Sequence, residues 1–194
     1  MQEEKIILPD SDLIYYRDFL VEKEAQQFLK IFIEEFPWRQ DKIKLFGKEH
    51  LQPRLTALFA DNAKPYTYSG ITMQPDEFPE PLLKIKHRAE EVCGTKFTTC
   101  LANLYRDGQD SMGWHADDEK ELGKNPVIAS VSLGAERMFH LKHKQEKSLK
   151  HKLRLENGSL FLMQGLTQHF WKHQIPKTKK VTAPRINLTF RKIK

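Results

Sequence analysis

A histidine and an aspartate stand two residues apart near the middle of the chain, in His115-Ala116-Asp117. On an extended segment, side chains at positions i and i+2 point to the same side, so this imidazole and this carboxylate can bind one ion. Two histidines and one carboxylate that leave open positions on the metal suit non-haem Fe(II). A single His-x-Asp is weak evidence, because chance alone gives roughly 0.4 such matches in a chain of this composition. The interpretation therefore needs a third ligand and further partners.

The third ligand is expected from the strand-like segment Gln168 to Ile175, which contains His169 and His173. Four residues separate these two histidines, so both fall on one face of an extended segment. Spacing alone does not choose between them.

Polar side chains alternate with apolar ones in the last predicted strand, residues 185–191. Arg185, Asn187, Thr189 and Arg191 share one face, while Ile186, Leu188 and Phe190 share the other. The arginines are ordinary surface charge if the apolar face alone is buried. In a closed two-layer barrel, the polar face instead lines a cavity. Arg185 and Arg191 are then about 20 Å apart at Cα, and their guanidinium groups can clamp a small dicarboxylate, since arginine binds carboxylates bidentately. Asn103 and Tyr105 share one face of another predicted strand, before the turn at Asp107-Gly108.

Two helices and a series of short strands must position these residues. The apolar spacing predicts a helix from Glu22 that Pro37 stops, and a second helix from Pro79 to Cys93 that ends at Gly94. After Gly94, short strand-like runs alternate with Gly, Pro and Asn turns, which favours a β-sandwich or jelly roll. No repeat or linker appears. The sequence therefore predicts one domain, residues 1–194, β-dominated α+β with supporting helices near the N-terminus.

The composition suits a soluble globular protein, with 39% hydrophobic and 30% charged residues. Lys and Arg outnumber Asp and Glu by 32 to 26, and a basic run from Arg137 to Arg154 attracts polyanions. Cys93 and Cys100 alone make no disulfide framework. The start lacks the features of a signal peptide, and no stretch is long and apolar enough to span a bilayer. We expect an intracellular protein: cytoplasmic in a bacterium, associated with the nucleoid when on DNA, or nuclear in a eukaryote.

Residues 38–70 offer two aromatic features with alternative interpretations. Phe46 precedes Gly47 among Lys42, Lys44 and Lys48, so it is either an apolar wedge at a hairpin tip or a buried side chain beside a solvated turn. Tyr66 and Tyr68 alternate, so their rings face one side of a strand, as core or as a platform for stacking a base.

The chain resembles AlkB-type Fe(II)/2-oxoglutarate-dependent dioxygenases. The resemblance rests on residues 103–105, 115–117 and 173–176 and on Arg-x-Asn-x-Thr-Phe-Arg at 185–191, which is the most specific piece. It extends from about Phe46 to the end. It is closest to the branch that repairs double-stranded DNA, through residues 46–48, 66–70 and 117–119.

The resemblance implies a double-stranded β-helix with a nucleotide-recognition lid at about residues 40–75. It implies Fe(II) held by His115, Asp117 and His173, and it favours His173 over His169. The cosubstrate 2-oxoglutarate is expected to contact Asn103, Tyr105, Arg185, Thr189 and Arg191. The alkylated base is expected to contact residues of the lid and of the segment after Asp117: Phe46, Gly47, Lys48, Tyr66, Tyr68, Asp118 and Glu119.

The implied reaction uses Fe(II), O2 and 2-oxoglutarate to remove N-alkyl groups from DNA bases of the 1-methyladenine and 3-methylcytosine type. The products are formaldehyde, succinate and CO2. The expected partner of a monomeric enzyme is alkylated DNA, duplex or single-stranded, with no membrane. Two alternatives stay open: an oxygenase that acts on RNA or on a protein side chain, and a catalytically silent jelly roll that binds nucleic acid.

Overall fold

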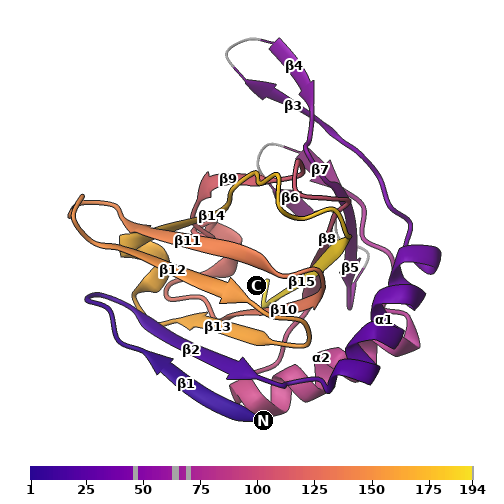
Figure 1. The fold of residues 1–194 in the computed structure, drawn as a ribbon, viewed down its shortest axis with the longest axis horizontal. Helices are drawn as coiled ribbons and strands as arrows, with labels where there is room; N and C mark the ends of the chain where they lie inside the picture. The colour runs from indigo at the N-terminus through magenta and orange to yellow at the C-terminus, as the bar shows by residue number, and fades with distance from the viewer. Residues whose placement is uncertain (46–47, 63–65, 69–70, 194) are drawn as a thin grey trace.

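Two antiparallel β-sheets face each other, and two helices cover the outside of the larger sheet (Figure 1). The computed structural model describes residues 1–45, 48–62, 66–68 and 71–193, and the side chains of residues 1–42, 49–62 and 73–193. Within these residues, no helix has the length and apolar composition to cross a membrane. The architecture is the jelly roll that the sequence predicts.

The larger sheet has seven strands, and the smaller sheet has four. In spatial order, the larger sheet contains β1 (Gln2–Ile6), β2 (Asp12–Arg17), β13 (Leu160–Gln164), β10 (Ile128–Gly134), β15 (Arg185–Arg191), β8 (Thr99–Tyr105) and β5 (Leu55–Ala60). The smaller sheet contains β12 (Lys150–Leu155), β11 (Arg137–His143), β14 (Trp171–Ile175) and β9 (Met112–His115). A short 3-10 helix, Lys120–Leu122, follows β9.

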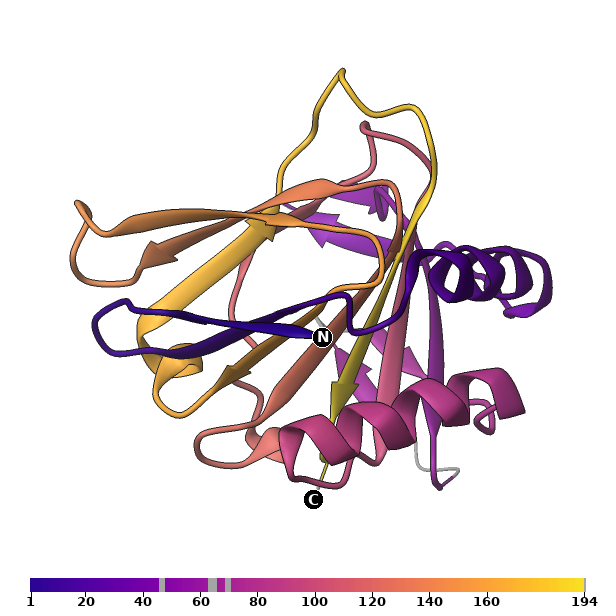
Figure 2. The same ribbon diagram turned by 60° about the horizontal axis from the view of Figure 1, so that its bottom comes forward.

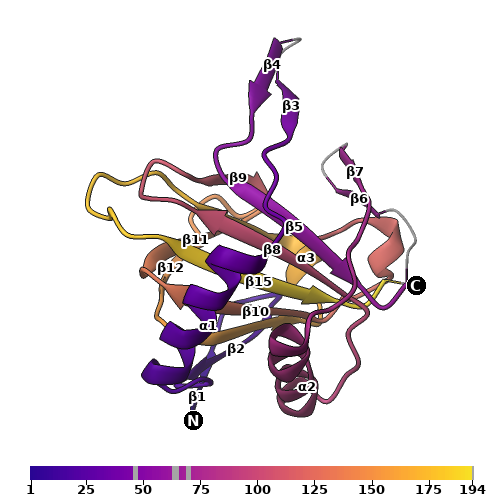
Figure 3. The ribbon, with the colours of Figure 1, turned by 90° about the vertical axis from the view of Figure 1, so that its right-hand side faces the viewer.

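Both predicted helices are confirmed, and both pack against the larger sheet (Figures 2 and 3). Helix α1 (Glu22–Glu35) ends just before Pro37, which cannot continue a helix. Helix α2 (Glu80–Cys93) ends at Gly94, whose φ of 61° is left-handed and suits glycine. Their apolar faces and the outer face of the larger sheet form one core.

Strand β15 is buried on both faces, which decides between the two interpretations of its polar side. Ile186, Leu188 and Phe190 pack in the core beneath the helices. Arg185, Asn187, Thr189 and Arg191 face the interior between the two sheets, and three of them line a pocket there. The arginines are therefore not surface charge. Because every residue of β15 is covered, its polar side chains must be hydrogen-bonded or hold a ligand.

The segment Gln168 to Ile175 is not one strand, so the prediction that His169 and His173 share its face is wrong. Residues Thr167–Phe170 form a short helix, α3, and only Trp171–Ile175 form a strand. The backbone N–H groups of His169 and Phe170 donate to the Leu166 carbonyl within this turn. They are therefore not available to a sheet ladder, and His169 points elsewhere, to Asn125 at 2.8 Å.

Two hairpins project from one side of the molecule within the predicted lid region (Figure 3). One pairs β3 (Lys42–Leu45) with β4 (Lys48–Leu51), and the other pairs β6 (Tyr66–Tyr68) with β7 (Ile71–Met73). The strands on either side of residues 46–47 thus pair with each other as a hairpin. Phe46 and Gly47 themselves lie outside the described residues, as do the side chains of Lys48, Tyr66 and Tyr68.

Candidate metal centre

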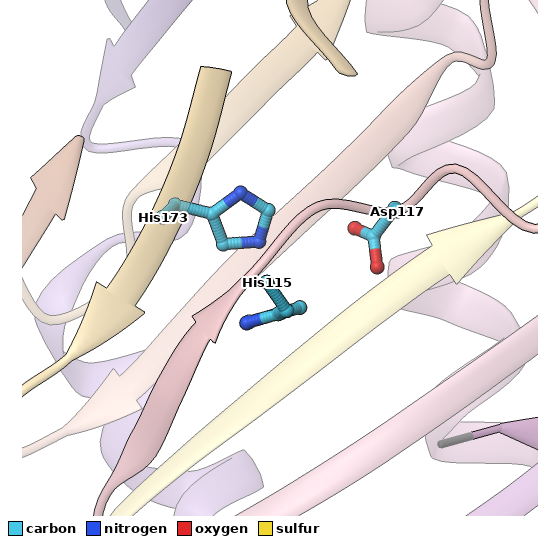
Figure 4. Close-up of side chains that lie close together, drawn as sticks. All are labelled: His115, Asp117 and His173. Atoms are coloured by element: carbon cyan, nitrogen blue, oxygen red, sulfur yellow. The ribbon is translucent and has the colours of Figure 1, made fainter. Parts of the chain in front are cut away.

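Three ligating side chains, from β9, from the segment that follows it and from β14, converge between the sheets. His115 ends β9, Asp117 follows it, and His173 lies on β14 directly opposite His115 in the strand register. One ligating atom from each residue lies within 4.8 Å of the others. Figure 4 shows the two rings and the carboxylate pointing toward a common centre. The arrangement is the two-histidine, one-carboxylate set expected from the sequence.

The protonation states of the three groups suit metal binding, which needs a carboxylate and neutral imidazoles. Burial would raise the pKa of Asp117, but the charge of Arg191 and the two nearby histidines lower that pKa to about 2. Burial lowers the pKa of His173 to about 3 and also lowers the pKa of His115. At neutral pH, the centre therefore presents one negative charge and two neutral rings.

Hydrogen bonds outside the triad orient two of the three ligands. The Nδ1–H of His115 donates to the Gly113 carbonyl at 2.8 Å, which leaves Nε2 free to bind a metal. The guanidinium of Arg191 donates to Asp117 Oδ1 at 2.7 Å. The Asp117 backbone N–H donates to the side-chain oxygen of Gln168 at 2.9 Å. The ring of His173 stacks on Phe139, with centroids 5.1 Å apart. These contacts fix the ligands before any metal arrives.

A polar pocket adjoins the centre along β8, β10 and β15. Its polar lining comes from Asn103, Tyr105, Ser130, Asn187, Thr189 and Arg191. Asn187 links this row, because it accepts a hydrogen bond from Ser130 at 2.9 Å and donates to Thr189 at 2.6 Å. Arg191 lies at the metal end, beside Asp117. The pocket is thus a continuous polar wall that begins at the metal ligands.

Arg185 is fully buried at the start of β15, at the end of this row away from Arg191. Its Nη2 donates to Ser132 at 2.9 Å and to Asn187 at 3.0 Å. Its Nε and Nη1 have no hydrogen-bond partner in the described part of the chain. Burial lowers the pKa of Arg185 to about 10, and the Tyr105 ring lies 5.3 Å from its Cζ. A buried guanidinium with two spare donors fits a carboxylate ligand.

A comparison with known proteins identifies the superfamily to which this chain belongs. The model of the 2OG-Fe(II) oxygenase superfamily matches residues 12–191. The chain belongs to this superfamily. Membership implies Fe(II), 2-oxoglutarate and O2, and the triad together with the spare donors of Arg185 fits the first two.

The relatives of this oxygenase place it among the AlkB-type members. Alpha-ketoglutarate-dependent dioxygenase alkB homolog 3 of Homo sapiens is 40% identical over 192 residues, which cover 94% of this chain and 66% of the relative. DNA oxidative demethylase ALKBH2 of Bos taurus is 42% identical over 178 residues, which cover 88% of this chain and 64% of the relative. The chain thus spans just under two thirds of the length of each.

A solved structure supports the fold of the oxygenase independently of sequence. The structure of OsALKBH1 superposes with a TM-score of 0.68 at 17% sequence identity, covering 98% of this chain and 100% of that one. At this identity, the likeness concerns the fold alone.

The two acidic residues after Asp117 have different surroundings in the oxygenase. Asp118 is exposed and forms an ion pair with Lys144 at 3.0 Å. Glu119 is half-buried, and its Oε2 is buried with no hydrogen-bond partner among the described residues. Burial raises the pKa of Glu119, and the charge of Asp117 adds to the increase. Of the two, only Glu119 keeps a buried oxygen available for a ligand.

Several polar residues that support the site were not predicted from the sequence. Gln168 holds the backbone of Asp117, and Ser132 holds Arg185. Arg54 is buried and donates from Nε to Asn103 at 2.8 Å. Ser130 and Ser132 alternate in their strand with apolar residues, so period-2 alternation is a signal that marks them as facing the interior. Arg54 carries no such signal, because it precedes its strand.

Proposed function

We propose that this oxygenase removes N-alkyl groups from nucleic-acid bases, with alkylated DNA as its substrate. The observation that supports the reaction type is the triad joined to a polar wall that ends at Arg185, whose buried donors fit the second carboxylate of 2-oxoglutarate. The substrate class is supported by the names of the relatives, of which ALKBH2 is a DNA oxidative demethylase.

Each residue of the site has a distinct task in this proposal. His115, Asp117 and His173 bind Fe(II). Bound Fe(II), 2-oxoglutarate and O2 supply the oxidation that hydroxylates the N-alkyl carbon, after which the base loses formaldehyde. Arg191, beside Asp117, orients the chelating end of 2-oxoglutarate, and Arg185 binds its distal carboxylate.

The remaining cosubstrate contacts come from the wall between the two arginines. Asn103, Tyr105 and Thr189 hold the cosubstrate by hydrogen bonds. Because the side chains of this wall are already bonded to one another or packed, little reorganisation is needed when the cosubstrate binds.

A methylated base in a duplex cannot reach the metal while stacked, so it must be flipped out. Methylation at N1 of adenine or N3 of cytosine abolishes pairing and adds positive charge. Tyr68 and the His115 ring can sandwich such a base, and the buried Glu119 oxygen can complement its charge. The hairpins at residues 42–51 and 66–73 form the lid over the base, with Phe46, Gly47, Lys48 and Tyr66 as further contacts. The lysines of the basic run, Lys142, Lys144, Lys147 and Lys150, contact phosphates without reading the sequence.

The decisive experiment compares methylated DNA with methylated RNA. Purified chain would be incubated with Fe(II), 2-oxoglutarate and oligonucleotides that carry one 1-methyladenine, and formaldehyde, succinate and the mass of the oligonucleotide would be measured. We expect equimolar formaldehyde and succinate with loss of one methyl group on DNA, and no product from the Asp117→Ala variant. Higher turnover on RNA would favour the RNA-directed alternative. No formaldehyde from either substrate would contradict the proposal.

A further inference from the structure

The outer face of the smaller sheet carries three lysines side by side. Lys142 on β11 lies opposite Lys150 on β12 and opposite Lys172 on β14 in the strand registers. Their neighbours along each strand, such as Leu141 and His173, are buried, so the lysines point outward. Like charges directly opposite one another destabilise a sheet. The stability of the sheet therefore does not explain why three lysines lie in one row.

These three lysines have no acidic partner in the described part of the chain. Some basic residues elsewhere on the surface are paired: Lys84 contacts Glu80, Arg88 contacts Glu24, and Lys96 contacts Glu90. Together with His143, Lys144 and Lys147, the three lysines line an open hollow on this face. Lys144 is paired with Asp118, so the uncompensated positive charge of the hollow comes from the other four lysines, and it fits a polyanion.

An exposed aromatic ring lies next to the lysine row. Trp114 is 37% exposed on β9, the edge strand of the smaller sheet, and Lys142 Nζ lies 4.3 Å from the centroid of its ring. Trp114 precedes the metal ligand His115 and points to the opposite side of the strand. Since β9 is the edge of its sheet, a chain of nucleotides can pass around it from the metal side to the outer face.

We propose that this outer face binds a single strand of nucleic acid, with a nucleobase stacked on Trp114 and phosphates on Lys142, Lys150 and Lys172. The proposal rests on the proposed function, because it assigns where nucleotides next to the target base are held. In a duplex, neighbouring bases cover both faces of each base. A base can therefore stack on Trp114 only where the strand is unpaired. In the free protein, Lys142 covers the ring by a cation–π contact. On binding, the base takes the place of the ammonium group, which moves to a phosphate.

An acidic peptide would also meet the lysines, but it has no series of rings to stack on Trp114. Base–aromatic stacking tolerates any sequence, and the lysine contacts are electrostatic. The site therefore fits a strand of nucleic acid of any sequence better than it fits a peptide.

The test measures binding of fluorescein-labelled oligothymidine of about 16 nucleotides to the full chain, by anisotropy and by tryptophan emission. Trp114→Ala should weaken binding about tenfold, and Trp114→Phe should restore most of the affinity while losing the quenching of tryptophan emission. The pair Lys142→Ala and Lys172→Ala should lower the salt slope of log K by about 1.4. The matched pair Lys23→Ala and Lys30→Ala, exposed on α1, should leave the slope unchanged.

Three outcomes would overturn the proposal: unchanged affinity in Trp114→Ala, an equal fall in the slope for the α1 pair, or equal competition by polyglutamate of matched charge. Because the probe is unmethylated and no turnover is measured, the result does not depend on whether the chain demethylates bases. If the chain binds the probe as expected but releases no formaldehyde from methylated DNA, the proposed function is wrong and the proposed binding face stands.

Discussion

The ligands of the metal centre are held by groups that sequence spacing does not show. The Asp117 carboxylate accepts a hydrogen bond from Arg191, and the Asp117 backbone N–H donates one to Gln168. His115 is fixed in one tautomer by the Gly113 carbonyl. Such outer contacts set the orientation and the basicity of a ligand. The pattern His-x-Asp therefore predicts which residues bind the metal, while the orientation of Asp117 depends on Gln168 and Arg191, which are 51 and 74 positions away.

The two histidines of residues 169–173 make a matched pair for testing the ligand assignment. His173→Ala removes one of three ligands, so we expect Co(II) affinity, measured by absorption titration under anaerobic conditions, to fall about a hundredfold or more. His169→Ala should leave the affinity unchanged, because His169 contacts Asn125 and lies in α3 outside the triad. Loss of the metal in His169→Ala with retention in His173→Ala would refute the assignment.

Two loops meet at the Arg185 end of the pocket. The turn after β8 and the loop at residues 176–184 before β15 exchange backbone hydrogen bonds, Gly108 to Val181 and Thr178 to Gly108, both at 2.8 Å. Figure 2 shows this loop rising above the sheets beside the turn. A Cβ on Gly108 would lie 2.2 Å from the Thr178 carbonyl, so only glycine permits this approach.

Arg137 joins the two loops from β11. It is 2% exposed, and it donates to the carbonyls of Asp107, Asp110 and Pro176 at 3.0, 2.8 and 2.7 Å. Its Cζ lies 5.6 Å from the ring centroid of Tyr105, whose other guanidinium neighbour is Arg185. Arg137 is thus a positioning residue for the strand ends that carry Tyr105 and Arg185.

Arg137→Met should raise the KM for 2-oxoglutarate about tenfold, because three carbonyls lose their donor and the two loops separate at that end of the pocket. The KM for the nucleic-acid substrate should change little. Arg137→Lys should recover only part of the loss, since an ammonium group cannot reproduce the planar fork. Arg154→Met, exposed on the neighbouring strand, is the control. Steady-state kinetics with each substrate varied in turn would decide; equal increases in both KM values would indicate a general loss of structure.

Local sequence patterns predicted most of the helices and strands. The features that they did not predict depend on contacts between residues that are far apart in the sequence or lack a repeating pattern. The two long helices and the alternation of β15 could be predicted from the sequence, because a 3.6-residue or 2-residue period repeats over the whole element. The strand β1 was missed, because Gln2–Ile6 is exposed along most of its length and shows no alternation. The short helix α3 was taken for a strand, since a single helical turn has no period to detect. Arg54 and Gln168 enter the site through contacts with residues about 50 positions away, which no local pattern records.

The lysine row and the projecting hairpins belong to different parts of the molecule (Figures 1 and 3). The outer face of the smaller sheet carries the row of Lys142, Lys150 and Lys172. The hairpins β3–β4 and β6–β7 project together from one side (Figure 3). A substrate that meets both surfaces must be extended. This arrangement fits a polynucleotide better than it fits an isolated nucleotide or a protein side chain.

The β3–β4 hairpin provides the test of how a duplex is handled. When a base leaves the stack, the neighbouring bases collapse into the gap unless a side chain fills it, and apolar wedges do this at a cost of a few kcal/mol per unstacked step. Phe46 stands between the two paired strands in sequence, although it lies outside the described residues. We predict that Phe46→Ala slows repair of 1-methyladenine in a duplex at least about tenfold more than repair of the same lesion in a single strand, where no gap forms.

Leu51→Ala is the matched control for this prediction, because Leu51 is an apolar side chain of the same hairpin that is 57% exposed. It should slow neither substrate. Single-turnover formaldehyde release on both substrates, with thermal melting of each variant, would separate the explanations. Equal losses on duplex and single strand together with a lower Tm would mean that Phe46 is a core residue. A duplex-specific loss at an unchanged Tm would assign it to the vacated position in the DNA stack.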